Sequence, residues 1–439
     1  MPVWLFYYGA ALVLLVSFVA LWALWPRPRL EQANGNGRPL PPGAQRFLLS
    51  PWLRVVLGAV SFGLLVVVAA AALVGETSPN ENLAPTFVYV IFWLGLVPFV
   101  VIFGNIWTVL SPWRAAADAF AWVSERTGLY WQAPFRYPER VGRWPAAALL
   151  FAFAALELAY SDPASPRALA LAVYLYSTVT WLGMLAFGRE AWTRNGEAFA
   201  VYFSLLARLA PFTRREGTIV ARPPVVGLTE YDTRPGTIAF VAVMLGSVAF
   251  DGLSRTTLWV DFRANVTAPA SERSLALADA VGTLLNVAGL LLVVCLVALA
   301  YLGAVAAARR VGDGGVNLPA AFLGSLIPIS LAYAVAHYFS LLVVQGQYAL
   351  PLVSDPFGFG WNLFGTAEEE PNLNVVSPTV IWYVQVGALV IGHVIGLVLA
   401  HDRAVGLYRT TGSAAASQYA MLVLMVTYTV AGLWLLSSG

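Results

Sequence analysis

The sequence is poor in the residues on which most soluble enzymes depend. Its 439 residues include one cysteine and three histidines, and only 11% of them are charged. Because a soluble domain is roughly a quarter charged, this composition excludes an ordinary soluble protein. The single thiol, Cys295, excludes an internal disulfide, and the sequence has no HExxH motif, no GxSxG motif and no P-loop. No local catalytic signature therefore identifies a function.

Long apolar runs are abundant instead, and hydrophobic residues make up 59% of the chain. A helix of about 20 apolar residues crosses the ~30 Å hydrocarbon layer of a bilayer. We therefore predict an all-α fold, a polytopic membrane bundle of about ten transmembrane helices that forms a single membrane-embedded domain over residues 1–439. The predicted spans cover residues 3–25, 55–75, 86–110, 145–161, 168–187, 236–253, 277–306, 318–346, 378–400 and 418–437.

The distribution of arginine predicts the orientation of the bundle. All 25 basic residues are arginines, and 21 of them fall in the segments that follow the odd-numbered spans. The other side holds only Arg167, Arg255, Arg263 and Arg273. This asymmetry follows the positive-inside rule, so we expect both termini outside, in a multi-pass protein of a bacterial inner membrane. The arginines flank the membrane, so the expected partner is the lipid bilayer and not nucleic acid.

The connections between spans differ in length and composition. The longer inner loops cover residues 26–54, 111–144 and 188–235, and the longer outer loops cover residues 254–276 and 347–377. The first inner loop predicts an irregular linker because it is rich in Pro, Gly and Asn. In the third, REAWTRNGEAFAVYFSLLARLAPF predicts an interfacial amphipathic helix, and GTIVARPPVVGL predicts a short extended segment.

Ionisable side chains at membrane depth are few, and their cost makes them the first candidates for a functional site. Glu157, Asp251 and His337 fall near the outer ends of the fourth, sixth and eighth spans, where they can share one layer. Carboxylates and imidazole can hold a divalent metal such as zinc with an open position for water. Without a metal, a carboxylate–histidine pair can still act as a general base. Arg255, four residues after Asp251, is suited to stabilise a developing oxyanion.

Uncharged polar residues extend this candidate site. Gln345, Gln347 and Gln385 lie toward the outer ends of the eighth and ninth spans, and we expect them to orient a substrate by hydrogen bonds. His393 in the ninth span and Asn105 near the inner end of the third are secondary candidates.

Two further features of the ninth span have structural interpretations. Gly392 and Gly396 form a small-xxx-small pair that favours close helix packing. His401, with Asp402 and Arg403, falls at the inner end of the span and is typical of an interfacial polar cluster.

His337 has structural as well as catalytic interpretations. It fits a core histidine bonded to a neighbour, a general base or metal ligand, or a haem ligand. A haem held by two histidines needs both at similar height. We place His337 and His393 ~10 Å apart in height from the helical rise per residue, which disfavours that arrangement.

Several stretches, spread over nearly the whole chain, together resemble one known family. They are PVWLFYYGAALVLLVSFVALWALWPRPRL, ENLAPTFVYVIFW, RYPERVGRWPAA, EAFAVYFSLLARLAP, AFDGLSRTTLW, AYAVAHYFSLLVVQGQ, FGWNLFGTA, IWYVQVGALVIGHVIGLVLAHDRA and SQYAMLVLMV. In this order they are similar to bacterial integral membrane proteins known as fenitrothion hydrolases. The resemblance implies hydrolysis of an organophosphate phosphotriester, a small apolar substrate, and implies no role for any particular residue. It also implies a natural precursor that begins upstream of Met1.

Three classes of function are compatible with the sequence. The leading hypothesis is a membrane-embedded hydrolase with an outward-facing site that is metal-dependent or uses a general base. The second is a transporter or channel for a small solute, with polar residues in both halves of the membrane marking a pathway. The third is a non-catalytic subunit of a membrane complex, with or without haem.

Overall fold

The protein is a bundle of long apolar helices. The computed structural model describes residues 3–128, 131–230, 232–312 and 317–438. Helices dominate these residues, which confirms the predicted all-α fold class. In this described part, nine helical segments are long and apolar enough to cross a membrane, and one further apolar helix, Trp144–Leu158, is shorter. Together they account for the ten predicted spans.

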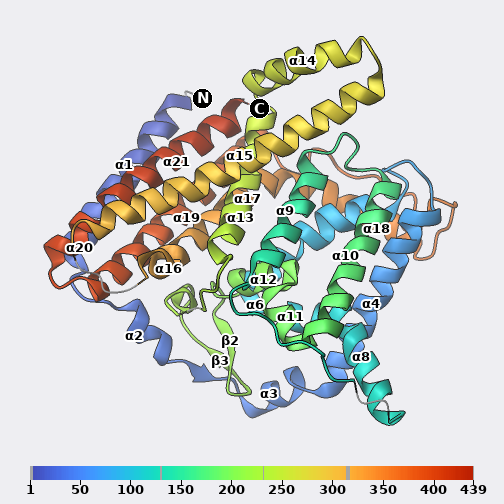
Figure 1. The fold of residues 1–439 in the computed structure, drawn as a ribbon, viewed down its shortest axis with the longest axis horizontal. Coiled ribbons are helices and arrows are strands. Elements are labelled where there is room, and N and C mark those ends of the chain that lie inside the picture. Colours follow the sequence, from blue (N-terminus) through green and yellow to red (C-terminus); the bar gives the residue numbers. More distant parts are fainter. Residues whose placement is uncertain (1–2, 129–130, 231, 313–316, 439) are drawn as a thin grey trace.

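Most spans begin and end close to the predicted positions, because apolar run length fixes where a helix can lie in lipid. The uninterrupted helices are α1 (Val3–Leu24), α4 (Pro51–Val74), α9 (Trp144–Leu158), α10 (Pro166–Phe187), α13 (Thr237–Ser254), α15 (Leu275–Arg309), α19 (Pro378–Leu407) and α21 (Tyr419–Ser438). The eighth span is α16 (Leu318–Phe322), η3 (Leu323–Ser325) and α17 (Leu326–Gln345), and α20 (Thr411–Ser417) precedes α21. Both termini lie at the same end of the bundle, as an even number of crossings requires (Figure 1).

The third predicted span is not one continuous helix. It consists of α5 (Leu83–Pro85), η1 (Thr86–Leu94), α6 (Leu96–Phe103) and α7 (Trp107–Leu110). η1 is a π-helix, a rare and wider turn that is frequent at functional sites. Gly104 ends α6 with φ of +90°, where a side chain would also collide with the Phe212 carbonyl, so the break requires glycine.

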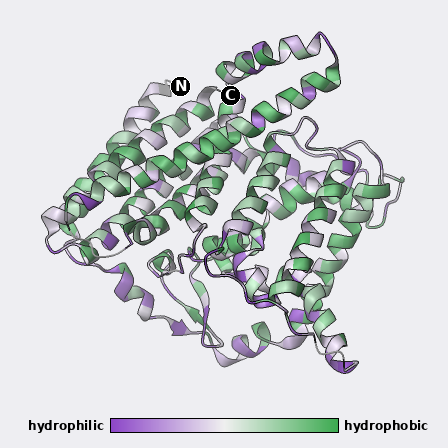
Figure 2. Ribbon diagram, viewed as in Figure 1, coloured by the Kyte–Doolittle hydropathy of each residue, from purple (hydrophilic) through white to green (hydrophobic). Residues whose placement is uncertain are grey.

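Short elements gather at the end of the bundle opposite the termini (Figure 1). They are α2 (Leu30–Gly35), β1 (Arg38–Pro39), α3 (Pro42–Leu48), α8 (Pro112–Arg126), α11 (Arg189–Asn195), β2 (Phe212–Arg215), β3 (Thr218–Ala221) and η2 (Val226–Leu228). β3 pairs antiparallel with β1 and β2, which confirms the first part of the predicted extended segment, whereas the end of that segment forms the 3-10 helix η2. Figure 2 shows hydrophilic residues concentrated here and hydrophobic residues along the long helices. We call residues 26–54, 111–143 and 188–235 the arginine-rich face.

The predicted interfacial amphipathic helix was wrong. The stretch forms two helices, α11 and α12 (Ala198–Leu206), and α12 is buried in the bundle along nearly its whole length. Its sequence AFAVYFSLL is apolar on every side, and a helix that is apolar all round is a buried helix. The amphipathic pattern arises because the polar residues of α11 and the apolar residues of α12 adjoin in sequence, whereas the helix breaks at Gly196.

The outer side is more helical than the sequence predicts. Residues 254–276, expected as a loop, form α14 (Thr257–Ser271), which packs against α15 and projects beyond the bundle with it (Figure 1). α15 has 35 residues and is therefore about 52 Å long, well beyond the hydrocarbon thickness. The other outer loop begins with η4 (Gly346–Tyr348) and α18 (Ala349–Ser354).

Close packing of α17 against α19 fulfils the expectation from the small-xxx-small pair. Gly392 faces Ala332 and the Pro328 carbonyl, and Gly396 faces the Ser325 carbonyl. A side chain at either glycine would force the two helices apart.

The predicted orientation can be tested with single cysteines in a Cys295→Ser background. Ser271→Cys lies at the exposed end of α14, and Glu125→Cys is exposed in α8 on the arginine-rich face. We expect a membrane-impermeant maleimide to label Ser271→Cys in intact cells and Glu125→Cys only after permeabilisation, because arginine-rich loops stay inside. The opposite labelling pattern would reverse the orientation.

Candidate functional site

An apolar cavity lies among the helices in the centre of the bundle. Its volume is about 240 Å³, and its walls come from η1, α6, α9, α12, α13 and α17. Most of the lining is aliphatic or aromatic. The polar side chains that line it are Trp93, Glu157, Tyr202, Ser247, Ser330 and Tyr338.

Helical spacing explains how the long helices present these side chains. On α9, Leu150, Phe153 and Ala154 line the cavity and are followed by Glu157 on the same face. On α13, Ser247 lines the cavity, and Asp251 comes four residues later. Residues three or four apart share one face of a helix, so both carboxylates lie at the outer ends of the faces that line the cavity.

Asp251 forms a buried contact with His337. Asp251 is 4% exposed, and its Oδ2 atom is hydrogen-bonded to His337 Nε2. Arg255 donates to Asp251 through Nε at 3.1 Å and Nη2 at 3.4 Å, while its side chain stays 63% exposed. The contact joins α13 to α17 and compensates a carboxylate that would otherwise be costly inside the bundle.

Glu157 lies beside this contact. Its carboxylate is close enough to the Tyr338 hydroxyl and to Asp251 to interact with both electrostatically. Tyr338 is adjacent in sequence to His337, so α17 contributes to both contacts. The structure thus brings together Glu157, Asp251, His337 and Arg255, as the shared depth of the first three suggested.

The contacts at this site do not provide the set of ligands that the predicted metal site requires. Among the residues that the structure describes, no group of three or more His, Cys, Asp and Glu side chains is placed to hold a metal ion. The His337 Nε2 atom, one of two imidazole ligand atoms, is bonded to Asp251. The described residues of this site are therefore acid–base groups without a set of metal ligands.

The substrate-orienting residues predicted from sequence lie outside the cavity wall. Gln345 is exposed at the end of α17, and Gln385 is partly buried on α19. Gln347 has a structural contact, because its amide donates to the Asn372 carbonyl at 3.2 Å and accepts from the Asn372 N–H at 3.0 Å. It thereby joins the two ends of the outer loop 347–377.

The two secondary candidates are also separate from the cavity. Asn105 is exposed in the break between α6 and α7. His393 is fully buried on α19, where Nδ1 contacts the Leu389 carbonyl at 2.8 Å and the ring lies against Tyr333 and Tyr428. These contacts describe a core histidine.

His401 and Asp402 form the polar cluster that the sequence predicts. Asp402 accepts from Trp25 Nε1 at 2.8 Å and from the Arg29 N–H at 2.6 Å, and His401 contacts the Trp25 carbonyl. The cluster ties the end of α1 to α19 and is separate from the central cavity.

Sequence reasoning missed the polar residues that α12 brings into the bundle. Glu197 is 0% exposed and caps α12, accepting from the Phe199 N–H at 2.9 Å and the Ala200 N–H at 2.8 Å. Its carboxylate also accepts from the Tyr176 hydroxyl at 2.5 Å and from Trp107 Nε1 at 3.2 Å. A glutamate directly after a glycine and before an apolar run was the available signal, because acidic residues favour helix N-termini.

Comparison of the chain with family models, curated proteins and solved structures gives no match. The case for a function therefore depends on the geometry of this site.

Two alanines on α9 provide a matched test of the cavity. Ala154 lines it, whereas Ala146 is 0% exposed and belongs to the packed core. We expect Ala154→Leu to change the free energy of unfolding by less than about 1 kcal/mol, because the added atoms fill empty space. Ala146→Leu should destabilise the protein by about 1–3 kcal/mol through overpacking. Equal losses for both variants in thermal unfolding would argue against the cavity.

Proposed function

We propose that the protein is a membrane-embedded hydrolase that uses the Asp251–His337 pair as a general base on a small apolar ester of the phosphotriester class. The observation that carries the proposal is the contact between Asp251 and His337 beside an apolar cavity, which is lined by Glu157 and by Tyr338, the sequence neighbour of His337. The resemblance of the sequence to fenitrothion hydrolases supports the same class of reaction.

The hydrogen bond to Asp251 assigns a role to each imidazole nitrogen. If Nε2 donates its proton to the carboxylate, Nδ1 carries the free lone pair that a base requires. Nδ1 of His337 then removes a proton from water, and the hydroxide attacks phosphorus. The bond from phosphorus to the leaving oxygen breaks, and that oxygen departs with the proton returned from the imidazolium. Asp251 stabilises the imidazolium while it exists, as the acid of a triad does.

Two other groups support this reaction. The Arg255 side chain donates to Asp251 but remains 63% exposed. Part of its guanidinium group is therefore available to bind an oxyanion. Guanidinium binds phosphoryl oxygens well because its N–H groups match their geometry. The Tyr338 hydroxyl and Glu157 line the cavity and supply a polar end for an otherwise apolar substrate.

The cavity suits a small, lipid-soluble substrate. Its volume of about 240 Å³ falls just below the range of roughly 300–1,000 Å³ typical of ligand pockets. An uncharged phosphotriester partitions into the bilayer, so a site inside the bundle is accessible to it.

Ala154→Leu, which fills the cavity, should therefore raise the KM for such a substrate.

The structure of the third span favours transport as the second candidate. Interrupted helices at membrane depth often line the pathways of transporters, and η1, α6 and the buried α12 all border the cavity. Counterflow of a radiolabelled solute in proteoliposomes, with no turnover of ester, would favour transport over hydrolysis.

Hydrolysis is tested by His337→Gln, which removes the base while keeping a polar side chain of similar size. We expect kcat for phosphotriester hydrolysis by the purified protein to fall by about 10²–10⁴-fold, the usual contribution of general base catalysis. Asp251→Asn should also lower kcat, because the imidazolium loses its counter-charge.

The matched control is Asp261→Asn, which removes an exposed outer carboxylate on α14. It should leave kcat unchanged, and the thermal unfolding of all three variants shows whether they are folded. Wild-type turnover in a folded His337→Gln variant would eliminate the proposed base.

A further inference from the structure

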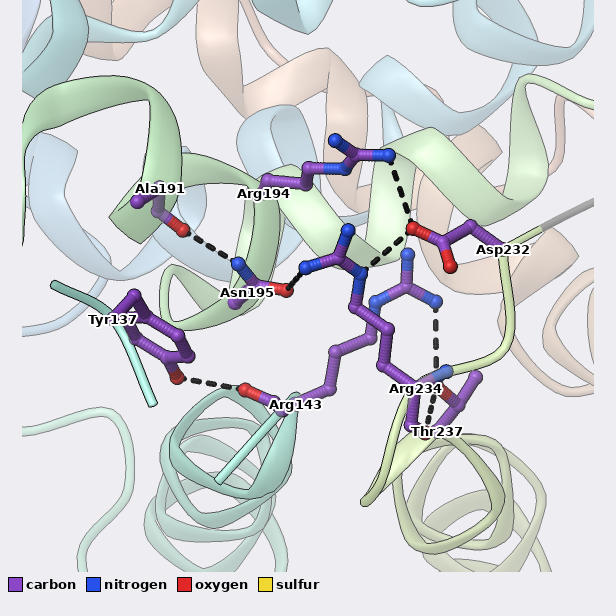
Figure 3. A network of polar contacts seen from close by, with 9 residues as sticks. Tyr137, Arg143, Ala191, Arg194, Asn195, Asp232, Arg234 and Thr237 are labelled. Carbon is purple, nitrogen blue, oxygen red and sulfur yellow. Dashed lines mark hydrogen bonds and ion pairs between the residues drawn. The ribbon is translucent and has the colours of Figure 1, made fainter. Parts of the chain in front are cut away.

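A second polar site lies on the arginine-rich face, at the opposite end of α9 from Glu157. Asp232 accepts from Arg194 Nη2 at 3.0 Å and from Arg234 Nε at 2.7 Å (Figure 3). Arg234 also donates to the Asn195 side chain at 3.0 Å. Arg143, at the start of α9, donates to the Thr237 hydroxyl at 3.3 Å beside this group.

The cluster carries an excess of positive charge. Arg143 interacts electrostatically with Arg194, Arg208 and Arg234, and Asp232 is the single acidic group among its main charge partners. The guanidinium groups of Arg143, Arg194 and Arg234 share the single carboxylate of Asp232, so positive charge is in excess. Like charges at this distance repel one another, so the arrangement is unfavourable without an anion.

Burial makes this imbalance more costly at Arg143. The residue is 5% exposed, and its Nε atom has no hydrogen-bond partner among the residues that the structure describes. Burial lowers the pKa of the Arg143 guanidinium to about 10, with repulsion from Arg208 and Arg234 adding to the effect. The group stays charged at neutral pH, so a buried donor remains unsatisfied.

The positive-inside rule, which accounts for arginines that set the orientation of the bundle, does not explain this arrangement. Arginines that only fix topology need to flank the membrane, and they can stay solvated. Here one arginine is buried at the centre, while Arg194 and Asp232 keep 61% and 38% of their side chains exposed. The cluster is therefore closed on one side and open to the aqueous face on the other, as a binding site is.

Exposed aromatic side chains lie close to the cluster in sequence. Trp144 follows Arg143 directly and is 56% exposed, and Trp131 and Phe135 precede it with 57% and 62% exposed. Aromatic residues of this kind concentrate at the level of lipid headgroups. The open side of the cluster is thus placed where phosphate groups of lipids occur.

We propose that Arg143, Arg194 and Arg234 form a binding site for a phosphate group, supplied by an anionic phospholipid headgroup or by free phosphate. Guanidinium groups bind phosphate oxygens through paired, charge-assisted hydrogen bonds. The Arg143 Nε atom supplies an unsatisfied donor, and Asp232 holds the two outer arginines until the anion arrives. The site is independent of the proposed hydrolytic centre.

The first experiment measures thermal unfolding of the full-length chain in nanodiscs. One arm compares discs of phosphatidylcholine alone with discs that contain phosphatidylglycerol, and the other adds inorganic phosphate against chloride at matched ionic strength. We expect an increase in Tm in at least one arm, because a ligand that binds only the folded state stabilises it. A response to phosphatidylglycerol alone assigns the lipid as the source, and a response to phosphate alone assigns the free anion.

Two substitutions of opposite expected effect then test the residues. Arg194→Gln should weaken binding of the effective probe by about ten-fold, the equivalent of one charge-assisted hydrogen bond. Asp232→Asn should strengthen binding, because it removes the competing carboxylate. Arg214→Gln, an exposed arginine of β2 on the same face, is the matched control and should bind as the wild type does.

Three results would contradict the proposal. The first is that neither probe raises the Tm of the wild type. The second is that Arg194→Gln and Arg214→Gln weaken binding equally, and the third is that Asp232→Asn weakens binding. The second result would indicate attraction by general surface charge, and the third would indicate that the cluster is a structural network.

Discussion

The cost of placing a charged carboxylate inside an apolar bundle constrains the whole outer half of this protein. Asp251 satisfies this constraint through His337 on the neighbouring helix and through Arg255 one turn away. A buried pair of this kind contributes little net stability, and loss of one partner is costly. The pair therefore fixes the relative position of α13 and α17, and it keeps an acid–base group at membrane depth.

The rest of the bundle builds a space beside that pair. The break in the third span and the buried helix α12 interrupt regular helix packing and leave a cavity. Glu157 lines this cavity and makes one end of it polar. The opposite face has different chemistry, since arginines exceed acids there and one of them is buried. The two sites lie at opposite ends of α9, so the proposed reactive centre and the proposed anion site share no residues.

The sequence predicts the spans well, because apolar run length depends only on the thickness of the hydrocarbon. It also predicts that Glu157, Asp251 and His337 share a layer, since depth along a helix follows from the rise per residue. Rotation of each helix depends on packing with its neighbours, so the positions of Gln345 and Gln385 outside the cavity were not predictable. The same holds for α12, whose burial around Glu197 depends on contacts with residues distant in the sequence.

A double-mutant cycle on Asp251→Asn and His337→Gln measures the energetic coupling between the two side chains. The free energy of unfolding is measured for both single variants and for the double variant under one set of conditions. Residues in direct contact show a coupling energy of about 0.5–3 kcal/mol, and we predict a favourable value within that range. Additive effects, within about 0.5 kcal/mol, would contradict a direct interaction between Asp251 and His337.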